Sequence, residues 1–141
     1  MVQAKILVVD DEKFITSSLK QHLEKEGYEV FTAESGEDGL GVFKTELPDI
    51  ILLDIHLPGM SGIKILEIIR TINKEVIVVI MTAYGDIETA VSAIKMGAYD
   101  FVEKPFDLNR ISILVKKALD TINLKREVIY LREEQYDKYN F

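Results

Sequence analysis

Five short apolar runs rich in β-branched residues recur along the chain, and this recurrence restricts its fold more than any other feature. The runs are residues 5–9, 29–32, 49–53, 76–81 and 99–102. Runs of this length and composition are typical of β-strands. The segments between them place apolar residues three and four positions apart, as in Ile15, Leu19 and Leu23, which is typical of amphipathic helices. The sequence therefore predicts strand and helix alternating five times.

Residues that commonly begin or end helices lie between these segments. Gly27, Pro48 and Gly97 follow the first, second and fourth helical segments, where a helix is expected to stop. Ser35 and Asp86 stand where the second and fourth would begin, and both residue types are good N-caps. The boundaries therefore agree with the periodicity.

Alternation of this kind predicts parallel strands joined by right-handed crossovers, with helices on both faces of one sheet. Residues 50–53 and 76–80 are apolar throughout, as expected of strands that are covered on both faces. A chain of 141 residues is too short for a closed eight-stranded barrel, which needs about 250. We therefore expect one α/β domain with an open, doubly wound, five-stranded parallel sheet in the order 2-1-3-4-5, plus a short appendage.

The composition excludes several classes of function. With 48% hydrophobic residues the chain can form a core, and with no cysteine it can form no disulfide, thiolate zinc site or cysteine nucleophile. The first residues lack the pattern of a signal peptide, and no apolar run is long enough to cross a membrane, so we expect a cytoplasmic protein without a membrane partner. A net charge of −7 argues against direct binding to nucleic acid.

Polar residues follow four of the five predicted strands. Asp10 and Asp11 follow the first, Asp54 the third, Thr82 the fourth and Lys104 the fifth. Each has a structural explanation: the first two could cap a helix, Asp54 could open a turn, Thr82 could cap and Lys104 could extend into solvent. Because the carboxyl ends of parallel strands share one edge of the sheet, we expect these groups to gather there.

Strands one and three are neighbours in this order, so Asp10, Asp11 and Asp54 should converge. Three close carboxylates repel one another unless a cation lies among them. Oxygen ligands without histidine or cysteine side chains favour a hard divalent ion, and Mg²⁺ is the best match. Opposite such an ion, Lys104 and Thr82 could hold a phosphoryl group.

Four segments together resemble a known family over residues 4 to about 122. They are residues 6–12, 53–62, 81–85 and 104–106. The chain resembles the receiver domain of bacterial two-component response regulators, which has a flavodoxin-like, CheY-like fold.

The resemblance implies a signalling switch rather than a conventional enzyme. Asp54 would accept a phosphoryl group from a phosphohistidine on a sensor histidine kinase. Asp11, Asp54 and the backbone carbonyl of His56 would bind Mg²⁺ directly, and Asp10 would bind it mainly through water.

It also implies the response to phosphorylation. Lys104 would pair with the phosphoryl oxygens, Thr82 would move to hydrogen-bond one of them, and Phe101 would swing inward. In this family the bond between Lys104 and Pro105 is usually cis. The output face would comprise the fourth helix, the fifth strand and the fifth helix, and it would change the dimer.

His56 and Tyr84 occupy two positions that vary in the family and modulate loss of the phosphoryl group. Both side chains are bulky here, which suggests hindered water and slow decay. His56 could equally be a passive, solvent-facing side chain.

The last helical segment is longer than a receiver needs. Nothing breaks a helix from Asp107 to about Gln135, which allows a length of roughly 43 Å. A receiver spans only about 30 Å, so the end must protrude or fold back. The apolar stripe also changes phase, to a second stripe of Leu124, Val128 and Leu131. The second stripe is too short to establish a coiled coil.

We therefore divide the chain into a receiver at 1–122 and a helical linker at 123–141. The linker could simply fray, or it could form a homodimer, alone or together with the output face. Residues 138–141 resemble the approach to the AAA+ ATPase of NtrC-class transcription activators, which implies missing AAA+ and DNA-binding domains. The chain has no Walker motif and should itself hydrolyse no ATP.

Three other functions compete with this interpretation. A phosphatase of the haloacid-dehalogenase type needs a second aspartate where His56 stands. A flavodoxin-like electron carrier would place FMN phosphate against Asp10, Asp11 and Glu12, which would repel it. A degenerate receiver that serves only dimerisation is the third alternative, although every site residue expected of an active receiver is present.

Overall fold

The computed structural model describes residues 3–139, excepting the side chains of 130 and 133–139. The described residues alternate five strands with five helices. The strands are β1 (Lys5–Val9), β2 (Glu29–Ala33), β3 (Ile50–Asp54), β4 (Ile77–Ala83) and β5 (Asp100–Lys104). The helices are α1 (Lys13–Lys25), α2 (Gly36–Glu46), α3 (Gly62–Ile72), α4 (Ile87–Lys95) and α5 (Leu108–Tyr139). The predicted alternation is confirmed, and no strand end differs from its prediction by more than two residues.

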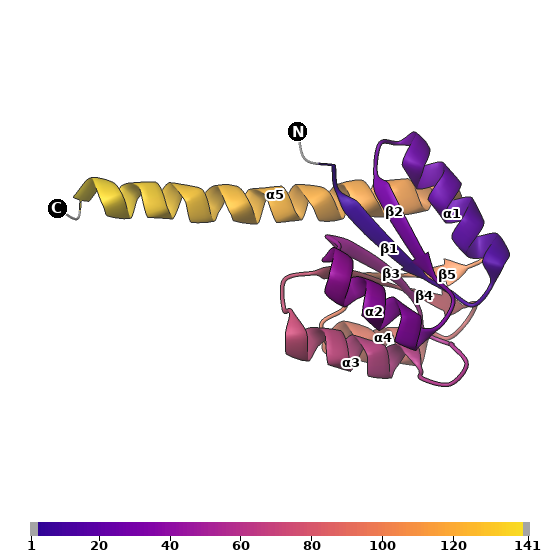
Figure 1. Ribbon diagram of the computed structural model, residues 1–141. Helices are drawn as coiled ribbons and strands as arrows, with labels where there is room; N and C mark the ends of the chain where they lie inside the picture. The colour runs from indigo at the N-terminus through magenta and orange to yellow at the C-terminus, as the bar shows by residue number, and fades with distance from the viewer. Residues whose placement is uncertain (1–2, 140–141) are drawn as a thin grey trace.

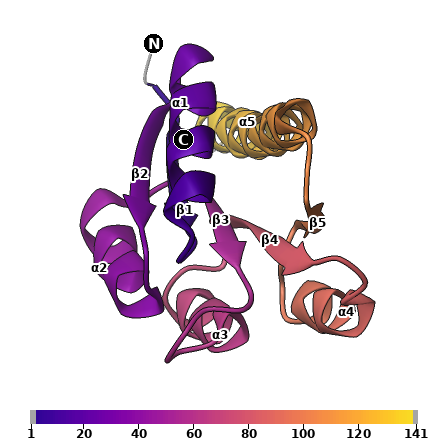
Figure 2. The same ribbon diagram turned by 90° about the vertical axis from the view of Figure 1, so that its right-hand side faces the viewer.

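The strands form one parallel sheet in the order β2-β1-β3-β4-β5. Helices α1 and α5 cover one face of it, and α2, α3 and α4 cover the other, as Figure 2 shows from the end of the sheet. The predicted open, doubly wound order is therefore confirmed. This order places the ends of β1 and β3 side by side in the middle of the sheet.

The core consists of two apolar layers, one on each face of the sheet. Phe43, Ile65 and Ala93 bring α2, α3 and α4 into the first layer. Leu23 and Val115 bring α1 and α5 into the second. Every residue of β3 is buried, because both layers contact this central strand. Continuous apolar runs are therefore required at the centre of the sheet.

The helix ends follow the signals in the sequence. The Ser35 hydroxyl accepts a hydrogen bond from the backbone N–H of Asp38 at the start of α2, and Asp86 occupies the N-cap position of α4. Helix α2 ends at Glu46, and its C-cap residue is Leu47, whose φ of 51° lies in the left-handed region. Pro48 follows, and a proline disfavours right-handed helical backbone at the residue before it.

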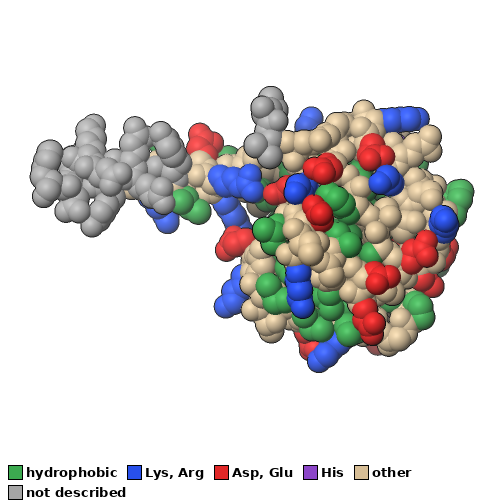
Figure 3. Space-filling view, viewed as in Figure 1, with side chains coloured by type: hydrophobic (Ala, Val, Ile, Leu, Met, Phe, Trp, Pro, Cys, Tyr) green, Lys and Arg blue, Asp and Glu red, His purple; other side chains and the backbone are tan. Residues whose placement is uncertain are grey.

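Helix α5 has two parts with different surroundings. Its first part is packed on the sheet through buried Ile111, Val115 and Ala118. Its second part leaves the body and protrudes, as Figures 1 and 3 show. There Leu124 is 61% exposed and Val128 is 46% exposed. The expected protrusion is thus confirmed, and the helix extends past Gln135. No helix in the described part of the chain is both long and apolar enough to cross a membrane.

Candidate functional site

Three carboxylates come together at the carboxyl edge of the sheet. Asp10 and Asp11 follow β1 and Asp54 ends β3, and one carboxylate oxygen of each lies within 4.8 Å of the others. Asp10 is fully buried and Asp54 is 4% exposed, whereas Asp11 is exposed to solvent. Direct pairing of β1 with β3 produces this convergence. The cluster is therefore buried on one side and open on the other.

The ammonium group of Lys104 lies against this cluster. Its Nζ is 2.7 Å from Asp10 Oδ2, 3.2 Å from Asp54 Oδ2 and 3.8 Å from Glu12 Oε1. The contact with Asp54 is a hydrogen bond, whereas the contact with Asp10 lacks hydrogen-bond alignment and is an ion pair. The Lys104–Pro105 peptide bond is cis. One ammonium thus faces several carboxylates, which leaves the site with excess negative charge.

The second oxygens of the buried carboxylates are held by backbone amides. The N–H of Glu12 donates to Asp10 Oδ1 at 2.8 Å, and the N–H of His56 donates to Asp54 Oδ1 at 3.0 Å. The residue at the N-cap position of α1 is Glu12 rather than Asp10 or Asp11. The alternative that Asp10 or Asp11 caps α1 is therefore wrong, although Asp10 Oδ1 still accepts a hydrogen bond in the turn before this helix.

Burial and neighbouring groups together set the pKa values of Asp54 and Lys104. Burial raises the pKa of the Asp54 carboxyl, and Asp10 raises it further, while the His56 amide and Lys104 oppose the increase. Burial alone would lower the pKa of Lys104, but its contacts with Asp10 and Asp54 outweigh burial, and the pKa lies above its ordinary value. The charged form of Lys104 is therefore stabilised at this site, whereas burial makes the charged form of Asp54 less favourable.

Thr82 lies in β4, which continues to Ala83, and the N-cap of α4 is Asp86, so the alternative explanation that Thr82 caps a helix is wrong. It is 1% exposed, and its Oγ1 has no hydrogen-bond partner among the described residues. A buried hydroxyl without a partner is unfavourable and uncommon. Phe101 on β5 is partly buried and packs against the core layer of α2, α3 and α4. Thr82 is therefore a donor available to an added group.

The donor set of the cluster fits a hard divalent cation. Its ligand atoms are carboxylate oxygens, and Mg²⁺ prefers such ligands together with water. Asp10 Oδ2 is buried with no directed hydrogen bond among the described residues, and exposed Asp11 leaves room for solvent. The arrangement could hold Mg²⁺ beside Asp54.

Sequence reasoning missed one contact at this site. His56 Nε2 lies 2.7 Å from Asp86 Oδ2, although the His56 side chain is 57% exposed. Asp86 could be recognised in the sequence only as a helix cap. Tyr84 is 84% exposed, and shielding of the site by this side chain stays a prediction.

Gly62 allows α3 to begin directly against the end of β3. A Cβ added there would overlap the carbonyl oxygen of Asp54 and the Cα of Ile55. Both are backbone atoms that cannot rotate away. The absence of a side chain at Gly62 therefore helps to fix Asp54 in position.

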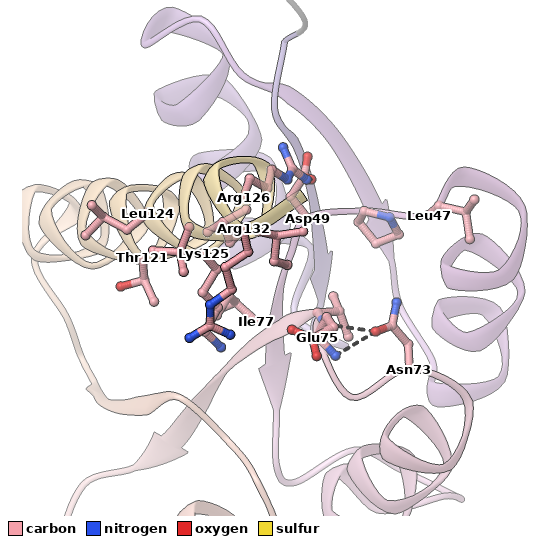
Figure 4. A pocket seen from close by; sticks show the side chains of 15 residues that line it. Leu47, Asp49, Asn73, Glu75, Ile77, Thr121, Leu124, Lys125, Arg126 and Arg132 are labelled. Atoms are coloured by element: carbon pink, nitrogen blue, oxygen red, sulfur yellow. Dashed lines mark hydrogen bonds and ion pairs between the residues drawn. The ribbon is translucent and has the colours of Figure 1, made fainter. Parts of the chain in front are cut away.

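A pocket of about 860 Å³ lies at the opposite, amino edge of the sheet, under the protruding part of α5 (Figure 4). Leu124 and Val128 of α5 line one side of it, and Leu47 and Ile77 line the other. The pocket is separate from the carboxylate cluster.

Comparison with known proteins points to one family. Residues 6–116 match the family described as "Response regulator receiver domain". The nitrogen assimilation regulatory protein NtrX of Azorhizobium caulinodans is 44% identical over 130 residues, which cover 91% of this chain and 29% of that protein. Sporulation initiation phosphotransferase F of Bacillus subtilis is 41% identical over 119 residues, covering 84% of this chain and 96% of that protein.

Solved structures agree with these matches. The crystal structure of NtrX from Brucella abortus in complex with ADP superposes with a TM-score of 0.87 at 42% identity, covering 92% of this chain and 30% of that one.

The regulatory protein AtoC of Escherichia coli is 39% identical over 92% of this chain. NtrX and AtoC are NtrC-class regulators with N-terminal receivers. The chain spans less than a third of the length of these regulators.

Proposed function

The chain belongs to the response regulator receiver domain family, and we propose that it is a phosphorylation-activated switch in which Asp54 accepts a phosphoryl group from a sensor histidine kinase. The observation that carries this proposal is the position of Asp54. It is a buried carboxylate at the end of the central strand, held by the His56 amide and contacted by Lys104 at 3.2 Å.

In the proposed reaction an Asp54 oxygen attacks the phosphorus of a phosphohistidine. A P–O bond forms, the P–N bond breaks, and the electron pair remains on the imidazole of the kinase. The carboxylate is the reactive form, and burial acts against it by raising the pKa of Asp54. Lys104 opposes this effect and favours the charged form of Asp54. Its ammonium also lies where it can neutralise the phosphoryl oxygens.

We further propose that Asp11, Asp54 and the backbone carbonyl of His56 bind Mg²⁺, with Asp10 acting mainly through water. When bound, the ion would neutralise the carboxylates and the transferred group. The excess negative charge of the cluster and its oxygen-only donor set support this assignment.

The transferred group would add a charge of about −1.5 to −2 beside Lys104. Thr82 Oγ1, which has no partner among the described residues, would gain one by moving to donate to a phosphoryl oxygen. Phe101 is partly buried on β5, the strand that pairs with β4, and would swing inward as Thr82 moves. The surface of α4, β5 and α5 would change with them, as required of an output face.

Intact mass after incubation with acetyl phosphate and Mg²⁺ tests the proposal. We expect wild type to gain the mass of one phosphoryl group and to lose it on treatment with hydroxylamine, which cleaves acyl phosphates. Asp54→Ala should gain nothing, and Asp120→Asn, which removes an exposed carboxylate of α5, should behave as wild type. An equal gain in Asp54→Ala would refute the assignment.

For the output we propose a homodimer that signals to attached domains. The NtrC-class relatives are more than three times as long as this chain, which supports a receiver and linker (1–122 and 123–141) followed by AAA+ and DNA-binding domains in a cytoplasmic transcription regulator. Receivers promote their own phosphorylation and dephosphorylation, and we propose the same here.

The linker part of α5 supports a second copy as the partner. Leu124, Val128 and Leu131 are 61%, 46% and 50% exposed and form one stripe on a helix that leaves the body. Arg126, 3.3 Å from Asp49, ties the start of this part to the amino edge of the sheet. Two such helices could bury their stripes against each other.

Light scattering with and without acetyl phosphate tests this contact. Replacing Leu124, Val128 and Leu131 together by Gln should remove the dimer. Ile113→Gln alters an apolar side chain that is 67% exposed on the packed part of α5. Loss of the dimer in Ile113→Gln alone would assign the contact to the face of α4, β5 and α5 instead.

A further inference from the structure

His56 and Asp86 form a bridge between the two loops that follow the central strands of the site. His56 lies two residues after Asp54, and Asp86 lies at the N-cap position of α4. Their side chains meet at 2.7 Å, although the two residues are 30 positions apart. Because β3 and β4 are hydrogen-bonded neighbours, the loops that follow them lie side by side, and the bridge joins one loop to the other.

The loop that carries Asp86 is also held from its other side. Glu103 Oε2 of β5 accepts a hydrogen bond from the backbone N–H of Gly85 at 3.3 Å. Gly85 has a φ of +86°, a left-handed conformation that glycine adopts without strain. The turn between Thr82 and α4 is thus contacted by one side chain on each side, His56 and Glu103, and both contacts restrain Asp86.

From this arrangement we propose that Asp86 is a positioning residue that holds the His56 imidazole beside the phosphoacceptor and thereby lengthens the life of the phosphorylated state. The proposal rests on the proposed phosphorylation of Asp54. It assigns to Asp86 a role in the reaction beyond its place at the start of a helix.

The physical argument begins with the exposure of His56. A side chain that is 57% exposed would sample several rotamers unless something held it. Asp86 Oδ2 is the atom that meets His56 Nε2, and a carboxylate only accepts hydrogen bonds. A neutral imidazole must therefore carry its proton on Nε2 to bond to Asp86. One rotamer and one tautomer are selected together.

Hydrolysis of an aspartyl phosphate needs a water molecule on the solvent side of the phosphorus. The backbone N–H of His56 donates to Asp54 Oδ1, so His56 adjoins this carboxylate, and its side chain is exposed to solvent. A ring held there reduces the room for an attacking water, whereas a free ring leaves it open for part of the time. Release of the ring should therefore speed hydrolysis.

The first test measures the lifetime of the phosphorylated protein by intact mass after removal of acetyl phosphate. Asp86→Ser keeps a residue that can cap α4, but its side chain is too short to reach His56. We expect hydrolysis to become about fivefold faster, because one hydrogen bond to the imidazole is lost. Asp86→Asn retains an acceptor oxygen and should restore most of the lifetime. Glu88→Gln removes a neighbouring acid of the same turn and should leave it unchanged.

A double variant separates positioning from a general effect on the fold. If Asp86 acts through the imidazole, Asp86→Ser should have no further effect on hydrolysis in a His56→Ala background. An equal acceleration in both backgrounds, or none in the single variant, would overturn the proposal.

The second test needs no phosphorylation, so it distinguishes failure of this inference from failure of the proposed function. Nitrogen-15 NMR of the imidazoles should show His56 as one tautomer with the proton on Nε2 in wild type, and as a mixture in Asp86→Ser. The second histidine, His22, contacts Ser112 on α5 and serves as an internal control that should not change. Unchanged His56 signals in Asp86→Ser would overturn the positioning role even if wild type accepted no phosphoryl group.

Discussion

Lys104 Nζ lies 2.7 Å from Asp10 Oδ2, and this ion pair joins the end of β5 to the end of β1 across the two strands between them. The Lys104 side chain is only 18% exposed, and that of Asp10 is fully buried. We predict that Lys104→Met lowers the free energy of unfolding by about 3–5 kcal/mol, because it leaves buried carboxylates without their cation. Urea unfolding at neutral pH measures this, with exposed Lys116→Met as the control.

The same variant should respond more strongly than wild type to Mg²⁺. Without the ammonium group the carboxylates repel one another more strongly, so a divalent cation relieves a larger penalty. Equal stabilisation of both proteins by Mg²⁺ would show that Lys104 and the ion do not share this site.

The raised pKa of Asp54 predicts a dependence of stability on pH. Because burial raises this pKa, the native state binds the proton more tightly than the unfolded state does, and stability falls as the pH rises above the ordinary value of 3.8. The penalty grows as the pH rises from 3.8 through the raised pKa of Asp54 in the native state. Asp54→Asn should therefore raise the free energy of unfolding by about 1–3 kcal/mol at pH 7 without Mg²⁺.

This gain should shrink on acidification and disappear below the unfolded-state pKa, where Asp54 is protonated in both states. Thermal unfolding of wild type and Asp54→Asn across the acid range measures the difference. A variant that is less stable than wild type at neutral pH would mean that its contact with Lys104 outweighs burial.

Asp11 provides a test of the metal site that leaves the buried residues intact. We predict that Mg²⁺ at a hundredfold excess over its dissociation constant stabilises wild type by about 2.7 kcal/mol, and that Asp11→Asn loses most of this gain. Glu12→Gln alters the next acid, which contacts Lys104 at 3.8 Å but is outside the carboxylate cluster. If both variants lose the response equally, Mg²⁺ acts by non-specific screening of acidic residues rather than by binding at the cluster.

Most of the fold follows from patterns that act along the chain. The apolar run ending at Asp54 predicts a strand buried on both faces, and the alternation with helices predicts parallel strands. The order 2-1-3-4-5 is a common one for doubly wound sheets. The convergence of Asp10 and Asp54 follows as well, because parallel strands bring their carboxyl ends to one edge. These inferences need only periodicity, connectivity and the common strand order of doubly wound sheets.

Contacts between side chains of separate loops do not follow from such patterns. His56 and Asp86 meet because of the exact course of two loops, and neither residue type indicates the other in the sequence. Likewise, Thr82 could be placed near a strand end, but its missing hydrogen-bond partner is a property of packing. The assigned roles of Asp54, Lys104 and Phe101 rest on the family resemblance and stay predictions until the experiments are done.

Gly62 offers a final prediction, on how the phosphoacceptor strand is held in place. An added Cβ would overlap the Asp54 carbonyl oxygen and Ile55 Cα, so Gly62→Ala must displace either the end of β3 or the start of α3. We predict a loss of about 1–3 kcal/mol in the free energy of unfolding, as is typical of overpacking, together with slower phosphorylation by acetyl phosphate. Gly41→Ala is the matched control, because no described atom lies within 4 Å of its added Cβ in α2. There the change should stabilise the protein by up to about 1 kcal/mol through helix propensity, with phosphorylation unaffected. If Gly62→Ala were as stable and as reactive as wild type, the close approach of α3 would not be what positions Asp54.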